Sequence, residues 1–88
     1  MPSPADRPRD LAVVMAFDPM QGLLDLESRI AQMKADASAL GYPFDRHNVR
    51  NELQAATFRL RDARDVRLLL GPSGAIAIEV MPANSSQL

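Results

Sequence analysis

The short stretch GYPFD near the middle of the chain constrains the fold most, because it ends one helix and begins another. Gly41 can adopt the left-handed conformation with which helices commonly end, and Pro43 cannot continue a helix. Asp45 offers a carboxylate that caps a new helix. Phe44 and Val49 occupy the two positions of a hydrophobic staple around that cap. We therefore predict two consecutive helices joined by a tight reversal.

The segments on either side of this reversal carry apolar residues at helical spacing. The apolar positions recur every three or four residues and form one face of each helix. They are Leu26, Ile30, Met33, Ala37 and Leu40 before the reversal, and Val49, Leu53, Ala56 and Leu60 after it. Asp25 is predicted to cap the first helix, and Glu27 suits the positive end of its dipole.

Three further apolar segments are typical of strands. Residues 11–17 form a continuous apolar run, and after an Asp-Pro turn residues 23–24 can pair back on it. Residues 65–70 and 75–80 flank the turn GPSG and predict a hairpin, in which Ile76, Ile78 and Val80 share one face. The predicted fold class is α+β, a small antiparallel sheet with two helices on one face, in the order β-(β)-α-α-β-β.

Length and composition predict a single domain at residues 11–81. The chain has 88 residues, which suffices for one small domain. Residues 1–10 are proline-rich and are predicted to be disordered, and residues 82–88 are predicted to be a flexible tail. The absence of cysteine favours a reducing, cytoplasmic setting. With a net charge of −1 and no apolar segment of membrane-spanning length, neither nucleic acid nor a membrane is expected as a partner.

The two residues that most often carry chemistry are both predicted to face solvent. His47 is the one histidine and falls in the first turn of the second helix, with no partners spaced for a metal. Lys34 is the one lysine and lies beside the apolar face of the first helix, where an exposed ammonium group is a poor nucleophile. We predict no catalytic and no metal-binding residue.

Arginines concentrate in residues 46–67. Six arginines face three carboxylates there: Arg46, Arg50, Arg59, Arg61, Arg64 and Arg67 against Glu52, Asp62 and Asp65. Such a cluster can hold a phosphate or carboxylate, or it can be a solvated helix face with ion pairs four residues apart. We favour the solvated face, and nucleic acid is disfavoured because no interleaved aromatic residues are present to stack on bases.

Three motifs, "AFDP", "LESRIAQM" and "ASALGYPFD", occur in the order and spacing of a known family. With the segments around them they make nearly all of the predicted domain resemble the N-terminal small domain of class IV aminotransferase-like enzymes. These are pyridoxal-phosphate proteins of fold type IV. The nearest resemblance is to aminodeoxychorismate lyase of folate biosynthesis, including the form fused to aminodeoxychorismate synthase component I. The resemblance implies the same sheet-and-helix fold.

The positions that bind the cofactor in this family have changed in this chain. The arginine that holds the cofactor phosphate aligns with Gln32, and a nearby histidine aligns with Arg29. A Glu-Thr pair aligns with Val13 and Val14, and a further arginine aligns with Ala16. The family's catalytic lysine belongs to a larger second domain. The resemblance therefore implies no catalytic or cofactor-binding residue here, and no pyridoxal phosphate bound by this chain alone.

Three functions follow as hypotheses. The favoured one is a non-catalytic interaction module, either a homodimer or a partner of a separate large-domain protein, because the former cofactor lining has become apolar. The second is one half of a split pyridoxal-phosphate lyase in 4-aminobenzoate synthesis that needs another chain. The third is an anion-binding domain that uses the Arg46–Arg67 cluster.

Overall fold

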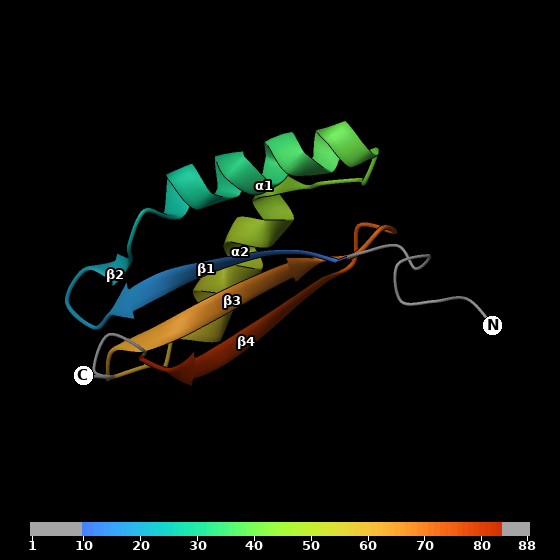
Figure 1. Cartoon of the computed structure of the whole chain (residues 1–88). Helices are drawn as coiled ribbons and strands as arrows, with labels where there is room; N and C mark the ends of the chain where they lie inside the picture. The colour runs from blue at the N-terminus through green and yellow to red at the C-terminus, as the bar shows by residue number, and fades with distance from the viewer. Residues whose placement is uncertain (1–9, 84–88) are drawn as a thin grey trace.

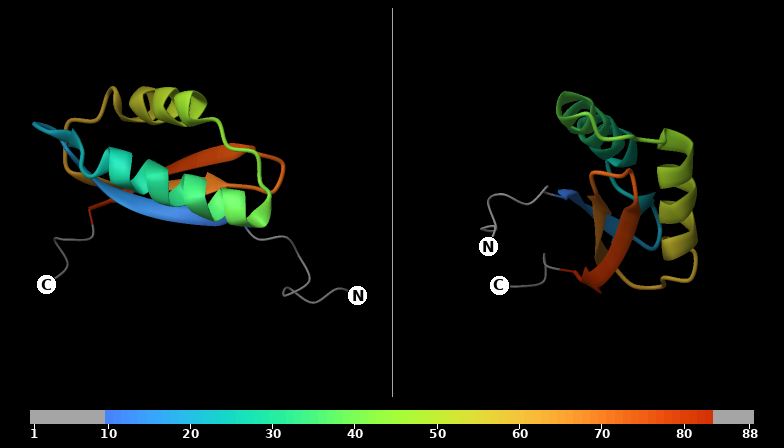
Figure 2. Two further views of the ribbon diagram at one scale, coloured as in Figure 1. Left: turned by 90° about the horizontal axis from the view of Figure 1, so that it is seen from above. Right: turned by 90° about the vertical axis from the view of Figure 1, so that its right-hand side faces the viewer.

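A computed structural model of the chain describes residues 10–83 and confirms the predicted α+β class and element order. Four strands form one antiparallel sheet in the order β2-β1-β3-β4, and two helices lie together on one side of it (Figures 1 and 2). The elements are β1 (Leu11–Asp18), β2 (Gly22–Leu23), α1 (Leu26–Leu40), α2 (Arg46–Thr57), β3 (Arg64–Leu70) and β4 (Ile76–Pro82). β4 thus extends one residue beyond the predicted boundary at residue 81, and the predictions for residues 1–9 and 84–88 lie outside the described residues.

Alternate residues of the strands divide the sheet into a covered and an uncovered face. In β1, Val13, Met15 and Phe17 are buried, whereas the residues between them are exposed. Val13 stands opposite Leu68 of β3, and Met15 stands opposite Val66. Because cross-strand partners point to the same side of a sheet, these residues form one apolar layer beneath the helices.

Both helices press their apolar faces onto this layer. The buried hydrophobic residues form one cluster from β1, α1, α2 and β3: Val13, Met15, Phe17, Ile30, Met33, Ala37, Val49, Leu53, Val66, Leu68 and Leu70. The prediction that Leu40 belongs to the buried face of the first helix is wrong, because Leu40 is 55% exposed. Leu40 lies in the last turn of α1, where the chain already turns away, and Tyr42 packs against the core beyond it.

The reversal between the helices has the predicted construction. Gly41 is left-handed, with φ 75° and ψ 22°. Its N–H donates to Ser38 O at 3.3 Å, and the N–H of Tyr42 donates to Ala37 O at 2.8 Å, which together make a Schellman motif. The carboxylate of Asp45 then accepts from the N–H of Asn48 at 3.2 Å and caps α2.

Two predictions at the other helix ends are wrong. Asp25 precedes α1 but its side chain makes no capping hydrogen bond, because its own backbone is left-handed with φ 57°. α2 ends at Thr57, so Leu60 packs against the core from the following loop instead of from the helix. Thr57, which the apolar pattern missed, is buried, and its hydroxyl donates to Leu53 O at 2.8 Å.

Candidate functional site

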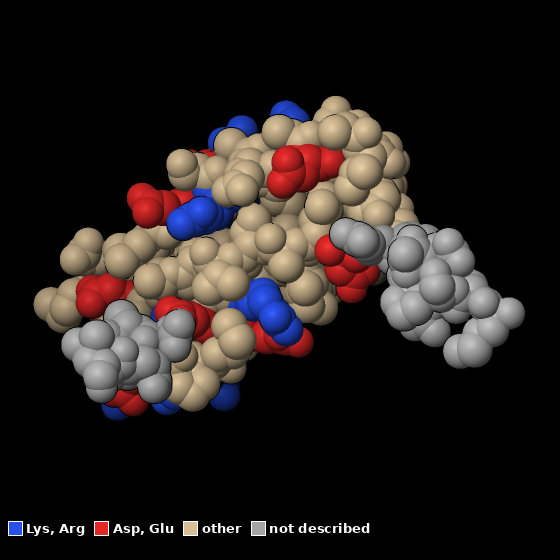
Figure 3. Space-filling model, in the orientation of Figure 1, with Lys and Arg blue, Asp and Glu red and all other residues tan. Residues whose placement is uncertain are grey.

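The side of the sheet opposite the helices carries no covering layer among residues 10–83. We call it the bare face, formed by Ala12, Val14 and Ala16 of β1, Asp65, Arg67 and Leu69 of β3, and Ala77, Glu79 and Met81 of β4. In Figure 3, where α2 lies behind the sheet, the surface over the strands is mostly uncharged, with a few charged groups between. A largely uncharged sheet face on a small domain is a candidate interaction surface.

The register sorts the bare face into rows that run across the strands. One end is apolar, because Ala12, Leu69 and Ala77 stand in one row. In the next row Val14 stands beside Arg67, and Arg67 stands beside Glu79.

The arginine in this row is already engaged. Nε of Arg67 donates to Glu79 Oε1 at 2.8 Å, and its Nη2 lies 2.5 Å from the same oxygen. The bare face thus carries one arginine, Arg67, and two carboxylates, those of Glu79 and Asp65, so its charged part is net negative.

The positions aligned with the cofactor site do not converge on one surface. Val14 and Ala16 lie on the bare face, and Val14 is 45% exposed. Val13 is buried beneath the helices, so the expectation that both valines line one former pocket is wrong. Gln32 is exposed on α1, which lies on the opposite side of the sheet. Strand alternation in the sequence could have separated the two valines, because adjacent residues of a strand point to opposite faces.

The structure also divides the arginine cluster. Arg46 and Arg50 of α2 both reach Glu27 of α1: Nη2 of Arg46 donates to Oε1 at 2.9 Å, and Nη2 of Arg50 donates to Oε2 at 2.5 Å. Nη2 of Arg64, at the start of β3, lies 3.7 Å from Oδ2 of Asp62 in the preceding loop. The predicted ion pairs four residues apart along a helix are therefore wrong, since the partners come from different helices or from a strand and the loop before it.

Glu27 relieves a repulsion that the spacing of the two arginines creates. Arg46 and Arg50 are four residues apart on α2, where like charges disfavour a helix. One carboxylate shared between them joins the start of α1 to the start of α2. The hydrogen bond from Arg46, followed by the charge of Arg50, holds the pKa of Glu27 below its usual value of 4.5.

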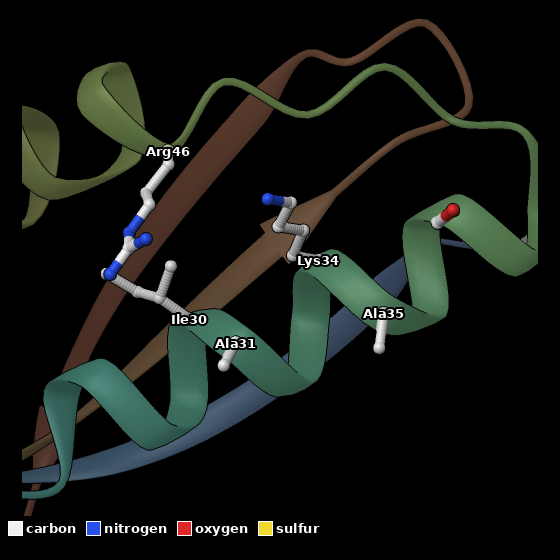
Figure 4. A pocket seen from close by; sticks show the side chains of 6 residues that line it. Ile30, Ala31, Lys34, Ala35 and Arg46 are labelled. Carbon is white, nitrogen blue, oxygen red and sulfur yellow. The ribbon is translucent and has the colours of Figure 1, made fainter.

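A cavity of about 420 Å³ opens between the two helices (Figure 4). Its walls are Ile30, Ala31, Lys34, Ala35 and Ser38 of α1 together with Arg46 of α2. A smaller cavity of about 210 Å³ is lined by Arg46, His47 and Arg50. Lys34 and His47 are both exposed, as predicted. Sequence reasoning treated these residues separately, and the fold brings Lys34 and Arg46 to one cavity.

Neither a metal cluster nor a membrane-crossing helix is found in the described part of the chain. No group of three or more His, Asp or Glu side chains within residues 10–83 is placed to hold a metal ion. Neither described helix combines the length and apolar character needed to cross a bilayer.

Comparison with known proteins finds a solved structure with a similar fold. No protein-family model matches the chain, and no curated protein matches it. Its fold is similar to part of the crystal structure of an inferred amino-acid aminotransferase from Mesorhizobium loti, with a TM-score of 0.78 and 24% sequence identity. The match covers 85% of this chain and 36% of the aminotransferase, so the chain spans about a third of that protein's length. The likeness shows an aminotransferase-like fold.

Proposed function

We propose that this domain is a protein-interaction module whose bare face packs against the same face of a second copy. The observation that carries the proposal is the exposure of apolar strand residues where a sheet normally gains a second layer. Val14 is 45% exposed, and it lies next to the apolar row of Ala12, Leu69 and Ala77. Apolar sheet surface of this kind gains free energy when a partner removes it from water.

One pair of charges on the bare face, Arg67 and Glu79, favours a second copy as the partner. Arg67 and Glu79 lie side by side near the middle of the face, and both are about half exposed. In a two-fold contact the same patch meets itself, so Arg67 of one protomer can approach Glu79 of the other. The Arg67–Glu79 pair is self-complementary in this arrangement, whereas Asp65 gives each copy one further negative charge that the contact has to leave in solvent.

The same face offers no site for pyridoxal phosphate, the cofactor of the family that the chain resembles. The phosphate of pyridoxal phosphate needs uncommitted donors or cations. Arg67 is the one cation among the described bare-face residues; Glu79 holds it, and Asp65 adds negative charge. Val14 and Ala16 offer apolar side chains only. The residues of the bare face do not fit the cofactor, so the proposal contains no cofactor-dependent step. The alternative, half of a split lyase, draws its support from the fold alone.

The substitution Val14→Thr tests the interaction module. Threonine keeps the branched shape and strand preference of valine but places a hydroxyl on the bare face. Burying an unpaired hydroxyl costs about 1–3 kcal/mol. Because each copy carries it, we expect the dimer dissociation constant to rise at least about tenfold in sedimentation equilibrium.

Val80→Thr is the matched control. Val80 is 42% exposed, close to the exposure of Val14, but it stands opposite Val66 on the helix-covered side of the sheet. We expect this variant to dimerise as the unaltered chain does. An unaltered chain that stays monomeric at every concentration would contradict the proposal, and so would equal effects of the two substitutions.

A further inference from the structure

The cavity between the helices, which we call the helix groove, has an apolar floor and a basic rim. Ile30, Ala31 and Ala35 supply apolar walls, and Lys34 and Arg46 supply charged groups. Figure 4 shows that the Lys34 and Arg46 side chains come from different elements and both project into the space between α1 and the start of α2. A concave, mainly apolar site with a few placed polar groups is the usual form of a small-molecule site.

The charges around the groove are not balanced. Glu27 is shared by Arg46 and Arg50, so one carboxylate faces two guanidinium groups. Lys34 makes no ion pair with any residue between 10 and 83, and no carboxylate lines this cavity or the smaller one beside it. The rim is therefore positive although the whole chain carries a net charge of −1. A local field of this sign attracts anions.

The boundaries of the groove favour a short molecule over a peptide that runs through it. α1 lies along one side, and the reversal at residues 41–45 passes along the other before Arg46 begins α2 (Figure 4). The bridge between Arg46 and Glu27 joins the two helices at one end. The volume of about 420 Å³ lies in the range of about 300–1,000 Å³ that is typical of small-molecule sites.

We propose that the helix groove binds a small amphipathic carboxylate, with its head between Lys34 and Arg46 and its hydrocarbon body on the apolar floor. Arg46 already binds one carboxylate, since its Nη2 donates to Oε1 of Glu27. Planar guanidinium groups favour carboxylates, and a nearby ammonium adds a second charge-assisted contact. A bare phosphate would leave the apolar floor in water. This site lies on the helix side of the sheet and does not depend on the bare face.

Octanoate is a suitable probe for this proposal. Acetate keeps its carboxylate without the long hydrocarbon chain, and octan-1-ol keeps the chain without the carboxylate. The amide resonances of the isotope-labelled full chain are followed by nuclear magnetic resonance during each titration. We expect octanoate to shift the resonances of Ala31, Lys34 and Ala35 in a saturable way. Acetate and octan-1-ol at the same concentrations should produce much smaller shifts, because each lacks one of the two contacts.

Charge variants test the rim. Lys34→Gln and Arg46→Gln should each weaken octanoate binding about fivefold or more, because each removes one charge-assisted contact. Glu27→Gln should strengthen binding, because it frees both arginines. Arg61→Gln is the matched control: it removes the same charge from an exposed loop position, and the affinity should stay within about twofold.

A shape variant tests the floor without removing charge. Ala35 is exposed on α1, so Ala35→Leu should be tolerated by the helix while it fills the groove and abolishes octanoate binding. Thermal melts establish that each variant is folded. The proposal is overturned if octanoate fails to bind, if octan-1-ol binds equally well, if Arg61→Gln weakens binding as much as Lys34→Gln, or if Ala35→Leu still binds.

Discussion

Two features of the structure favour glycine at position 74: a positive backbone φ angle and the lack of space for a side chain. Gly74 lies between β3 and β4 with φ 90°, a region that side chains disfavour. A Cβ atom at this position would lie 3.0 Å from Cβ of Pro43 and 3.3 Å from its carbonyl oxygen. The turn between the last two strands thus packs directly against the reversal between the helices. At Gly41 only the backbone conformation favours glycine. Its φ is 75°, but a Cβ atom there would meet no atom within 4 Å.

The two glycines therefore form a matched pair. We expect Gly41→Ala to lower the free energy of unfolding by about 1–2 kcal/mol, the cost of a left-handed alanine. Gly74→Ala should cost clearly more, because the strain is joined by the collision with Pro43. Urea denaturation of both variants measures the difference. Equal losses would mean that Pro43 shifts freely and that the two turns are not packed as described.

Glu27 joins α1 to α2, and this connection should depend on pH. Its pKa is lowered in the folded state, first by the hydrogen bond from Arg46 and then by the charge of Arg50. A carboxyl group whose folded pKa is depressed contributes stability above its unfolded pKa and loses that contribution as the pH falls through its folded pKa. The advantage of the unaltered chain over Glu27→Gln should therefore be greatest at neutral pH and should vanish in acid.

Urea denaturation from pH 7 down to about pH 2.5 measures this dependence. Glu52→Gln on α2 provides a control, because this exposed carboxylate is not part of the bridge. A difference between the unaltered chain and Glu27→Gln that stays constant over the whole range would contradict the assignment. It would mean that glutamate and glutamine differ there in helix preference and not in charge.

The helices and strands could be predicted because their signals are local. Gly41, Pro43 and Asp45 act on neighbouring backbone groups, and the apolar spacing of each helix spans only a few turns. The prediction for Asp25 is wrong because the type of a capping residue does not reveal its backbone angle, which is left-handed here. The prediction for Leu40 is wrong because periodicity does not show at which turn the side chains of a helix stop reaching the core.

The candidate sites depend on contacts between distant residues, which the sequence does not display. Glu27 is 19 residues from Arg46 and 23 from Arg50, so grouping arginines by their closeness in the chain assigned them the wrong partners. Lys34 and Arg46 share a groove only because the reversal folds α2 back beside α1. The separation of Val14 from Val13 was also not predicted, although strand alternation alone places the two side chains on opposite faces.

The molecule as a whole has one covered and one uncovered sheet face, and β3 runs through the middle of both. Leu68 points into the core and is fully buried, whereas its neighbour Leu69 points to the bare face and is half-buried. The two leucines are neighbours in one strand, but one packs in the core and the other lies on the bare face. Their alanine substitutions can therefore separate the forces that fold the chain from those that associate it.

We expect Leu68→Ala to lower the free energy of unfolding by about 2–5 kcal/mol, because it opens a cavity in the packed layer. Leu69→Ala should cost the monomer much less, because water already reaches that side chain. In sedimentation equilibrium the order should reverse: Leu69→Ala weakens association, whereas Leu68→Ala, under conditions where it stays folded, does not. If Leu69→Ala leaves dimerisation unchanged, the bare face is not the interface. If it destabilises the isolated domain as much as Leu68→Ala, the sheet has a second covered face.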